Sequence, residues 1–285
     1  MLKLVAMILA GLLLALPAVG QGLDKGLAAY GRGDYAAALR EWRPLAEQGD
    51  ASAQTFLGGL YHLGYGVPQD LAEAVRWYRK AAEQGLADAQ AFLAQAYATG
   101  EGVRQDHAEA AKWWRLAAQQ GHADAQNNLG LMYDKGQGVP QDHAEAVKWS
   151  RRAAEQGQAE AQFNLGLSYA KGEGVPQDFA EAAKWYRRAA EQGLAAAQFT
   201  LGKSYALGQG VPQDHVFAHM WANLAASRYP ASDKEKHNNA AKLRDLVAGM
   251  MNQAQIAEAQ RLAREWKPKT WAQVQAMESA ESRRR

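Results

Sequence analysis

Residues 51–86 read ASAQTFLGGLYHLGYGVPQDLAEAVRWYRKAAEQGL, and this 36-residue stretch decides the fold because four further copies follow it. The copies start at Ala51, Ala87, Ala123, Ala159 and Ala195, and the fifth ends at Pro230. Self-similarity at a fixed period of this size is the signature of a solenoid, in which each repeat buries its apolar face against its neighbours. We number the copies repeats 1 to 5 and the positions within each copy from 1 to 36.

The spacing of apolar residues within the repeat predicts two antiparallel helices. Positions 3, 7 and 11 are apolar in every copy, which predicts a first helix over positions 1–13. The glycine at position 14 suits the left-handed residue that ends a helix. The aspartate at position 20 is placed to cap the second helix, and a glutamate follows three residues later in four copies, as in a capping box. Position 8 is always Gly or Ala, which predicts close approach of a neighbouring backbone.

These positions resemble the Sel-1-like repeat, a relative of the tetratricopeptide repeat with a longer loop between its helices. The shared pattern is A-x-A-Q-x-x-L-G-x-x-Y-x-x-G-x-G-V-x-Q-D-x-A-x-A-x-x-W, and it covers residues 51–230. The resemblance implies an all-α protein, a right-handed α/α solenoid of helical hairpins that acts as a scaffold for protein or peptide partners. It implies no cofactor, no single partner and, in most members, no catalysis.

The first twenty residues, MLKLVAMILAGLLLALPAVG, predict a secretory signal peptide. They combine one lysine, an apolar run and a small-residue cleavage site. The run is short for a transmembrane helix, which needs ~20 apolar residues, and an uncleaved anchor helix is the alternative. We expect cleavage near Gln21, a periplasmic or secreted mature chain in a bacterial envelope, and no integral membrane span after cleavage.

The composition excludes several classes of stabilisation and partner. The chain has no cysteine, so disulfides and thiolate zinc sites are absent. Its net charge of +2 gives no reason to expect nucleic acid or an anionic membrane surface as a partner.

Two atypical segments flank the repeats, as solenoids require at their ends. Residues 21–50 predict a shortened N-terminal capping hairpin, in which Gly33 ends one helix and Asp34 caps the next. Residues 231–266 predict C-terminal capping helices. Residues 267–285 end in Glu-Ser-Arg-Arg-Arg and predict a flexible basic tail, with a loosely held helix as the alternative.

Two recurring features suggest ligand sites, but the repeat explains both. The G-x-G pairs leave a helix and have neither the preceding strand nor the third glycine of a dinucleotide site. Five of the nine tryptophans occupy position 27, where we expect burial in the core rather than a sugar platform. They are Trp77, Trp113, Trp149, Trp185 and Trp221.

The histidines do not form a metal site by pattern. His107, His143 and His215 share position 21 with Leu71 and Phe179, so this position predicts packing at the start of the second helix. His215 and His219 are spaced i, i+4, which suits a metal, but the sequence shows no third ligand nearby.

Ser168-Tyr-Ala-Lys171 matches the S-x-x-K of penicillin-binding enzymes, and some cysteine-rich relatives of this repeat family are linked to β-lactam binding. The partner motifs S-D-N and K-T-G and the cysteines are absent. An envelope enzyme, or enzyme subunit, acting on cell-wall or β-lactam chemistry is therefore the alternative function.

The variable positions of the first helix predict the partner-binding face. Positions 2, 5, 6, 9, 12 and 13 share one face opposite the apolar stripe, and by resemblance to tetratricopeptide repeats this face is concave. Positions 2, 6, 9 and 13 read Asp124, Asn128, Leu131, Lys135 in repeat 3 and Glu160, Asn164, Leu167, Lys171 in repeat 4, flanked by Asn127, Phe163, Phe199 and Lys203. Amides can hold an extended backbone, lysines attract carboxylates, and phenylalanines offer apolar anchors. The favoured function is a non-catalytic extracytoplasmic scaffold.

Overall fold

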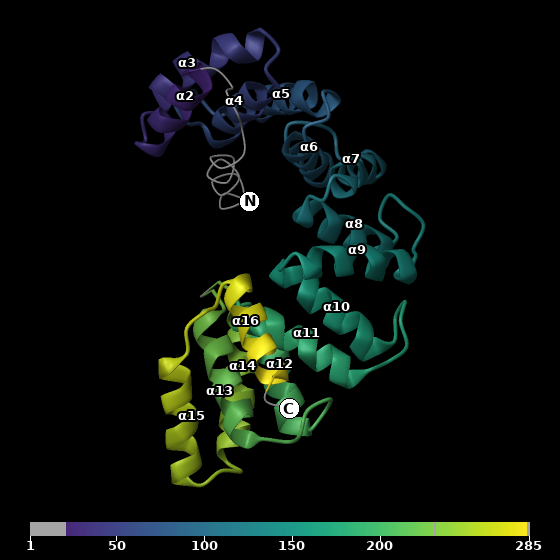
Figure 1. Ribbon diagram of the computed structural model, residues 1–285, viewed down its shortest axis with the longest axis vertical. Coiled ribbons are helices and arrows are strands. Elements are labelled where there is room, and N and C mark those ends of the chain that lie inside the picture. Colours follow the sequence, from purple (N-terminus) through teal and green to yellow (C-terminus); the bar gives the residue numbers. More distant parts are fainter. Residues whose placement is uncertain (1–20, 231, 284–285) are drawn as a thin grey trace. The chain divides into compact units, whose positions relative to one another are not determined.

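The computed structural model describes residues 21–230 and 232–283, so the predicted signal peptide lies outside the described residues. Within these ranges the chain forms fifteen α-helices and no strand (Figure 1). Helices that follow one another in the sequence pack against each other as pairs. The predicted fold class, an all-α solenoid of helical hairpins, is confirmed.

Each repeat contributes two helices of nearly constant length. The first helices are α4 (Ala51–Leu63), α6 (Ala87–Thr99), α8 (Ala123–Lys135), α10 (Ala159–Lys171) and α12 (Ala195–Leu207). The second helices are α5 (Leu71–Glu83), α7 (His107–Gln119), α9 (His143–Glu155), α11 (Phe179–Glu191) and α13 (His215–Arg228). Over the described residues, every helix is too short or too polar to cross a lipid bilayer.

The predicted ends of these helices are confirmed, except for half of the capping box. The glycine at position 14 is left-handed in all five repeats, with φ between 65° and 78°. Asp70 Oδ1 accepts a hydrogen bond from Glu73 N at 2.9 Å, which caps α5. The reciprocal bond of a capping box is replaced, because Asp70 N donates to Tyr61 O at 3.0 Å and the Glu73 side chain pairs with Arg76. This backbone bond ties the loop to the first helix instead.

The second glycine of each G-x-G loop is required by close packing between repeats. Gly102 has a φ of 71°, and a Cβ there would lie 2.1 Å from Leu71 O at the start of the preceding second helix. Gly138 and Gly174 show the same approach to His107 O and His143 O. These pairs are therefore structural, as the sequence predicted.

The chain divides into two compact units, which are described separately. The N-terminal unit extends to Gln141 and contains α2 (Gln21–Gly31), α3 (Tyr35–Glu47) and α4 to α8. Trp42, Phe56, Leu57 and Leu60 form the centre of one apolar cluster, and Leu93 lies in a second.

The C-terminal unit begins at Asp142 and contains α9 to α13, α14 (Lys234–Ala248), α15 (Gln253–Glu265) and α16 (Trp271–Ser282). Helices α14 and α15 both pack against α13. Leu201, Trp221, Val247 and Ala263 share one apolar cluster, so these two helices extend the core of the last repeat.

Regular side-chain bonds join successive repeats within each unit. An arginine at position 29 donates to the hydroxyl of the tyrosine eighteen residues later. The pairs are Arg43–Tyr61, Arg79–Tyr97 and Arg115–Tyr133 in the N-terminal unit, and Arg151–Tyr169 and Arg187–Tyr205 in the C-terminal unit. Gln84 Nε2 also donates to Gln54 Oε1 at 2.8 Å, and Gln120 and Gln192 repeat this bond with Gln90 and Gln162.

The C-terminal segment, residues 266–282, contacts repeat 4. Most of it is helix α16, in which Val274 is buried. Arg188 makes two bonds to the Glu278 carboxylate, at 2.7 and 3.1 Å, and Lys269 pairs with Glu191. The sequence alone did not show these partners because they lie in repeat 4, far away along the chain.

Burial of the repeated tryptophans follows the prediction with one exception. Trp77, Trp149, Trp185 and Trp221 are buried, but Trp113 is only half-buried. In repeat 2 the neighbouring Trp114, at position 28, is buried instead. Position 21 also varies, because the three histidines are half-buried and Phe179 is 40% exposed.

Candidate functional site

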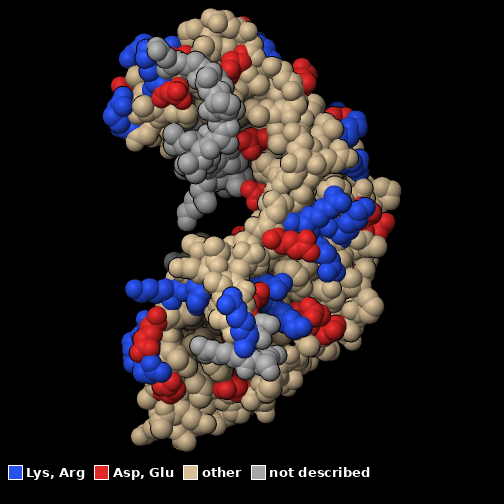
Figure 2. Space-filling model, in the orientation of Figure 1, with Lys and Arg blue, Asp and Glu red and all other residues tan. Residues whose placement is uncertain are grey.

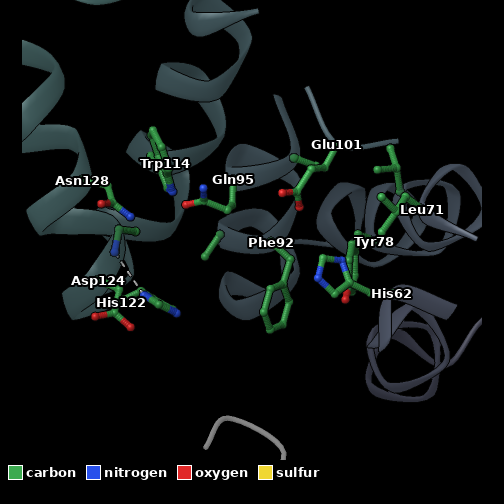
Figure 3. A pocket seen from close by; sticks show the side chains of 14 residues that line it. His62, Leu71, Tyr78, Phe92, Gln95, Glu101, Trp114, His122, Asp124 and Asn128 are labelled. Atoms are coloured by element: carbon green, nitrogen blue, oxygen red, sulfur yellow. Dashed lines mark hydrogen bonds between the residues drawn. The ribbon is translucent and has the colours of Figure 1, made fainter. Parts of the chain in front are cut away.

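The N-terminal unit contains a mainly apolar pocket formed by repeats 1 and 2 and the start of repeat 3. The hollow holds about 590 Å³, including its open mouth. Its lining residues are His62, Leu71, Val75, Tyr78, Ala91, Phe92, Gln95, Ala96, Glu101, Trp114, His122, Asp124, Ala125 and Asn128. In Figure 3 the Phe92 ring lies between Tyr78 and His62 on one side and Trp114 and Asn128 on the other.

Small residues at defined repeat positions create this space. Gly58, at position 8, lets the Tyr78 ring lie against α4, because a Cβ there would be 2.7 Å from the ring. Phe92 stacks on that ring with centroids 4.9 Å apart. Ala91 and Ala96 flank Phe92 and leave room where other repeats carry larger side chains. At Gly58 the close approach predicted for position 8 is made by this ring and by the backbone atom Ala74 O, 3.2 Å from such a Cβ. At Gly202 the nearest atoms are backbone atoms, Ala218 O and Ala222 N.

The rim of the pocket carries carboxylates and histidines, and none of the described residues that line it is a lysine or arginine. His122 Nδ1 accepts a hydrogen bond from Ala125 N at 3.2 Å, so Nε2 carries the proton that points to Asp88, 3.4 Å away. Burial lowers the pKa of His62, and the Glu101 carboxylate opposes this effect in part. His62 is therefore neutral at neutral pH, and Glu101 and Asp124 give the rim a negative charge.

One polar atom in the wall of the pocket lacks a partner. Tyr78 is 2% exposed, and its hydroxyl makes no hydrogen bond within the described part of the chain. Burial raises the pKa of this hydroxyl, so it stays protonated and can donate. A buried hydroxyl without a partner costs about 1–3 kcal/mol. A bound group with an acceptor in reach of Tyr78 would recover part of that cost.

The residues predicted for partner binding in the N-terminal unit have different environments. Asn128 lines the pocket, together with Asp124 from the same predicted stripe. Leu131 is half-buried and Lys135 is exposed. Asn127 is only 6% exposed, so position 5 faces inward in this repeat and its amide is not offered to a partner.

The predicted residues of the C-terminal unit include one close pair. Lys203 is exposed, and its ammonium lies 5.9 Å from the centre of the half-buried Phe199 ring. Phe163 and Leu167 are half-buried against the apolar cluster of repeats 4 and 5, and the Phe163 ring lies 5.7 Å from Tyr186.

The remaining two predicted residues lie on α10. Asn164 is half-buried, and its backbone carbonyl accepts a hydrogen bond from Ser168 Oγ at 3.3 Å. Lys171 is exposed and pairs with Glu173 at 3.2 Å. The Ser168 hydroxyl and the Lys171 ammonium therefore have separate partners, which is not the nucleophile and base arrangement of a penicillin-binding enzyme.

His215 and His219 are placed without other metal ligands around them. Across the described residues, neither belongs to a group of three or more ligating side chains. His219 is 4% exposed, and its Nδ1 has no partner in that part of the chain. Burial lowers the pKa of His219, and the nearby Arg244 adds to this effect.

Most of the pocket residues were not predicted as binding residues from the sequence. Phe92 and Gln95 occupy positions 6 and 9, the same stripe as Asn128 and Leu131 but one repeat earlier. The available signal was the pair of alanines beside Phe92 in repeat 2. Trp114 could not be placed from the pattern, because Trp113 holds the position that is buried in the other repeats.

The repeated hairpins and the absence of strands within the described ranges define an α/α solenoid protein. The family model described as Sel1 repeat matches residues 51–86, 87–122, 123–158, 159–194 and 195–229. The chain belongs to the Sel1 repeat family, whose members are generally protein-interaction scaffolds.

Several solved structures resemble the chain. A Sel1 repeat protein from Oxalobacter formigenes is 36% identical, with a TM-score of 0.68 over 74% of this chain and 86% of that one. The antigen c5321 of uropathogenic Escherichia coli is 29% identical, with a TM-score of 0.40 over 90% and 70%. A Klebsiella pneumoniae protein described as a sel1 repeat protein is 24% identical, with a TM-score of 0.45 over 73% and 98%. No curated protein matches the chain.

Proposed function

We propose that the chain is a non-catalytic scaffold outside the cytoplasm that binds an extended protein segment on the face formed by the first helices. The observation that supports this most is the pocket of the N-terminal unit. Its lining includes predicted variable positions of α6 and α8 beside residues of the second helices α5 and α7, and its interior is apolar. Binding pockets are typically largely apolar, with a few polar groups that orient the ligand.

The chemistry of the pocket favours a segment with an apolar anchor. Phe92, Val75 and Trp114 can contact a large apolar side chain. The carboxylates of Glu101 and Asp124 at the rim favour a lysine or arginine next to that anchor. We further propose that Asn128 contacts the main chain of the bound segment, because a carboxamide both donates and accepts.

The extracytoplasmic location is supported by the N-terminal sequence alone. Residues 1–20 have the composition of a secretory signal peptide, and they lie outside the described residues. Intact-mass measurement of the exported chain tests this part. We expect a chain that starts near Gln21, and a membrane-bound chain that retains Met1 would contradict it.

Site-directed crosslinking in cells tests the binding face. A photoreactive residue at Gln95, at the mouth of the pocket, should capture a partner. A photoreactive residue at Lys112, which is exposed on the second helix α7 and does not line the pocket, is the control. The change Gln95→Trp should then reduce capture by a second photoreactive residue at Asn128, because the indole fills the mouth.

The control change Lys112→Trp should leave that capture unchanged. Both variants replace half-buried or exposed side chains, so both should melt close to the wild-type temperature. Equal capture by wild type and a folded Gln95→Trp variant would place the partner elsewhere and overturn the proposed site.

A further inference from the structure

The C-terminal segment lies on a surface formed by the last residues of repeat 3 and the second helix of repeat 4, and the N-terminal unit carries the same residue types three repeats earlier. Trp271 covers Gly157, where a Cβ would lie 2.3 Å from the indole ring. Arg188 binds Glu278, and Arg187 lies 3.7 Å from Glu281. Together these contacts hold α16 against the last turns of α11.

Glu191 anchors the start of the same segment. It is 8% exposed and accepts a hydrogen bond from Trp266 Nε1 at 3.0 Å, besides its ion pair with Lys269. Its backbone carbonyl accepts from Lys269 N at 2.8 Å. We call Gly157, Arg187, Arg188 and Glu191 the α16 seat.

Three repeats earlier, the same four positions carry the same chemistry. Gly49, Arg79, Lys80 and Glu83 form this set, which we call the repeat 1 seat. Gly49 has a φ of 101°, close to the 94° of Gly157, so the backbone conformation is shared. Lys80 lies 4.2 Å from the Trp77 ring centre, as Arg188 does from that of Trp185. Arg79 bonds to Tyr97 at 2.7 Å, as Arg187 does to Tyr205.

The repeat 1 seat differs in being open. Among the residues that the structure describes, no atom lies within 4 Å of a Cβ built on Gly49, whereas Trp271 covers Gly157. Lys80 and Glu83 are exposed, whereas Arg188 is half-buried and Glu191 is buried. None of the four residues lines the pocket described above.

We propose that the repeat 1 seat binds a helix of a partner protein with the chemistry of α16. Such a helix carries a tryptophan in its first turn and an acidic residue two turns later, and a lysine precedes it. The tryptophan would cover Gly49, the acidic residue would pair with Lys80, and the lysine with Glu83. A lysine makes a point contact where Arg188 makes two bonds, so this interaction is weaker than that of α16.

A synthetic peptide of residues 266–283, WKPKTWAQVQAMESAESR, is the probe, and the full chain is the receptor. Fluorescence anisotropy should show saturable binding at a ratio of one to one. A benzophenone group in place of the Trp271 side chain should crosslink to residues near Gly49. Crosslinking near Gly157 instead would mean exchange with the chain's own α16 and would overturn the proposal, as would the absence of binding.

Charge reversal tests the contacts of the seat. Lys80→Glu should weaken binding of the peptide by about 10-fold, because an attraction between opposite charges is replaced by repulsion between two carboxylates. The matched control is Arg76→Glu, on the same helix, which applies the same charge change outside the seat and should have little effect. A peptide carrying Glu278→Lys should bind the Lys80→Glu chain better than the unchanged peptide does.

A second pair of variants tests the contact of Glu83 with the lysine that precedes the bound helix. Glu83→Lys should also weaken binding, and a peptide carrying Lys269→Glu should restore it. Equal affinity for the Lys80→Glu, Glu83→Lys and Arg76→Glu chains, each folded by circular dichroism, would overturn the proposal.

Discussion

The turns that end the second helices differ between the two units in surroundings but not in conformation. Gly85 and Gly121 in the N-terminal unit have φ of 94° and 92°, and a Cβ on either would meet no atom of the described residues within 4 Å. Gly157 and Gly193 in the C-terminal unit have φ of 94° and 96°, but they lie against Trp271 and Pro268. The repeat sequence therefore determines the local backbone, while a distant segment determines which copies stay exposed.

The largest expected effect compares the same tryptophan position in the two units. Trp149→Ala should lower the free energy of unfolding by about 3–5 kcal/mol, because it leaves a cavity where the side chain is 6% exposed. Trp113→Ala should cost less, since Trp113 is half-buried and Trp114 supplies the buried ring in repeat 2. Urea denaturation followed by circular dichroism measures both. Equal losses would show that burial does not separate the two positions.

The next effect tests the covered and the open glycine directly. Gly85→Ala and Gly157→Ala should each lower the free energy of unfolding by about 1–2 kcal/mol, because both place a side chain on a residue with left-handed backbone conformation. Gly157→Ala should cost more, because its methyl group overlaps Trp271. Combining Gly157→Ala with Trp271→Ala should remove the excess. If the excess persists in the double variant, Trp271 is not its cause.

A smaller effect concerns the ion pair that holds α16. A double-mutant cycle of Arg188→Ala and Glu278→Ala should give a coupling energy of about 1 kcal/mol or less. The pair is bidentate, which strengthens it, but both side chains are partly exposed to solvent, which limits its strength. The coupling should fall at high salt. Lys80→Ala, at the same position of the open seat, should change the stability of the isolated chain less. Tryptic cleavage after Lys269 reports release of the segment.

The smallest effect is a dependence of stability on pH, and it separates two histidines. The pKa of His219 and that of His62 are lowered by burial, so the unfolded chain binds protons first as the pH falls. The contribution of these two neutral histidines to the free energy of unfolding is fully present above pH ~6.5, the ordinary pKa of histidine. It is lost as the pH falls below that value. His219→Gln should reduce this loss more than His62→Gln does, because His219 is the more buried. Melting temperatures between pH 5 and 8 test the order.

Sequence reasoning succeeded where a contact is local and repeated. The left-handed Gly64 and the capping Asp70 each act within a few residues of their own helix, so five copies give the same signal. The second hydrogen bond predicted for the capping box, from Asp70 N to the Glu73 side chain, does not form because Asp70 N donates to Tyr61 O instead. That competition depends on how the long loop folds back, which spacing does not encode.

The site was harder to predict because it depends on side-chain volumes from several helices. The pocket combines Ala91 and Phe92 of α6 with Tyr78 of α5 and Trp114 of α7. Each of these residues is unremarkable in its own helix. The docking of α16 was missed for a related reason, since Trp271 and Glu278 find their partners in repeats 3 and 4.

The separation of bonded residues along the chain also predicts the order in which the C-terminal unit folds. The Arg–Tyr bonds join residues eighteen apart, and the Gln–Gln bond joins residues thirty apart. The bonds of Arg188 and Glu191 to the C-terminal segment span 75 to 90 residues. Closing a loop of ninety residues instead of eighteen costs about 1.4 kcal/mol more in chain entropy, and nearby contacts form faster. Hairpins therefore assemble first, and α16 docks last, so a ribosome-bound or partly refolded chain presents repeat 4 with its seat still empty.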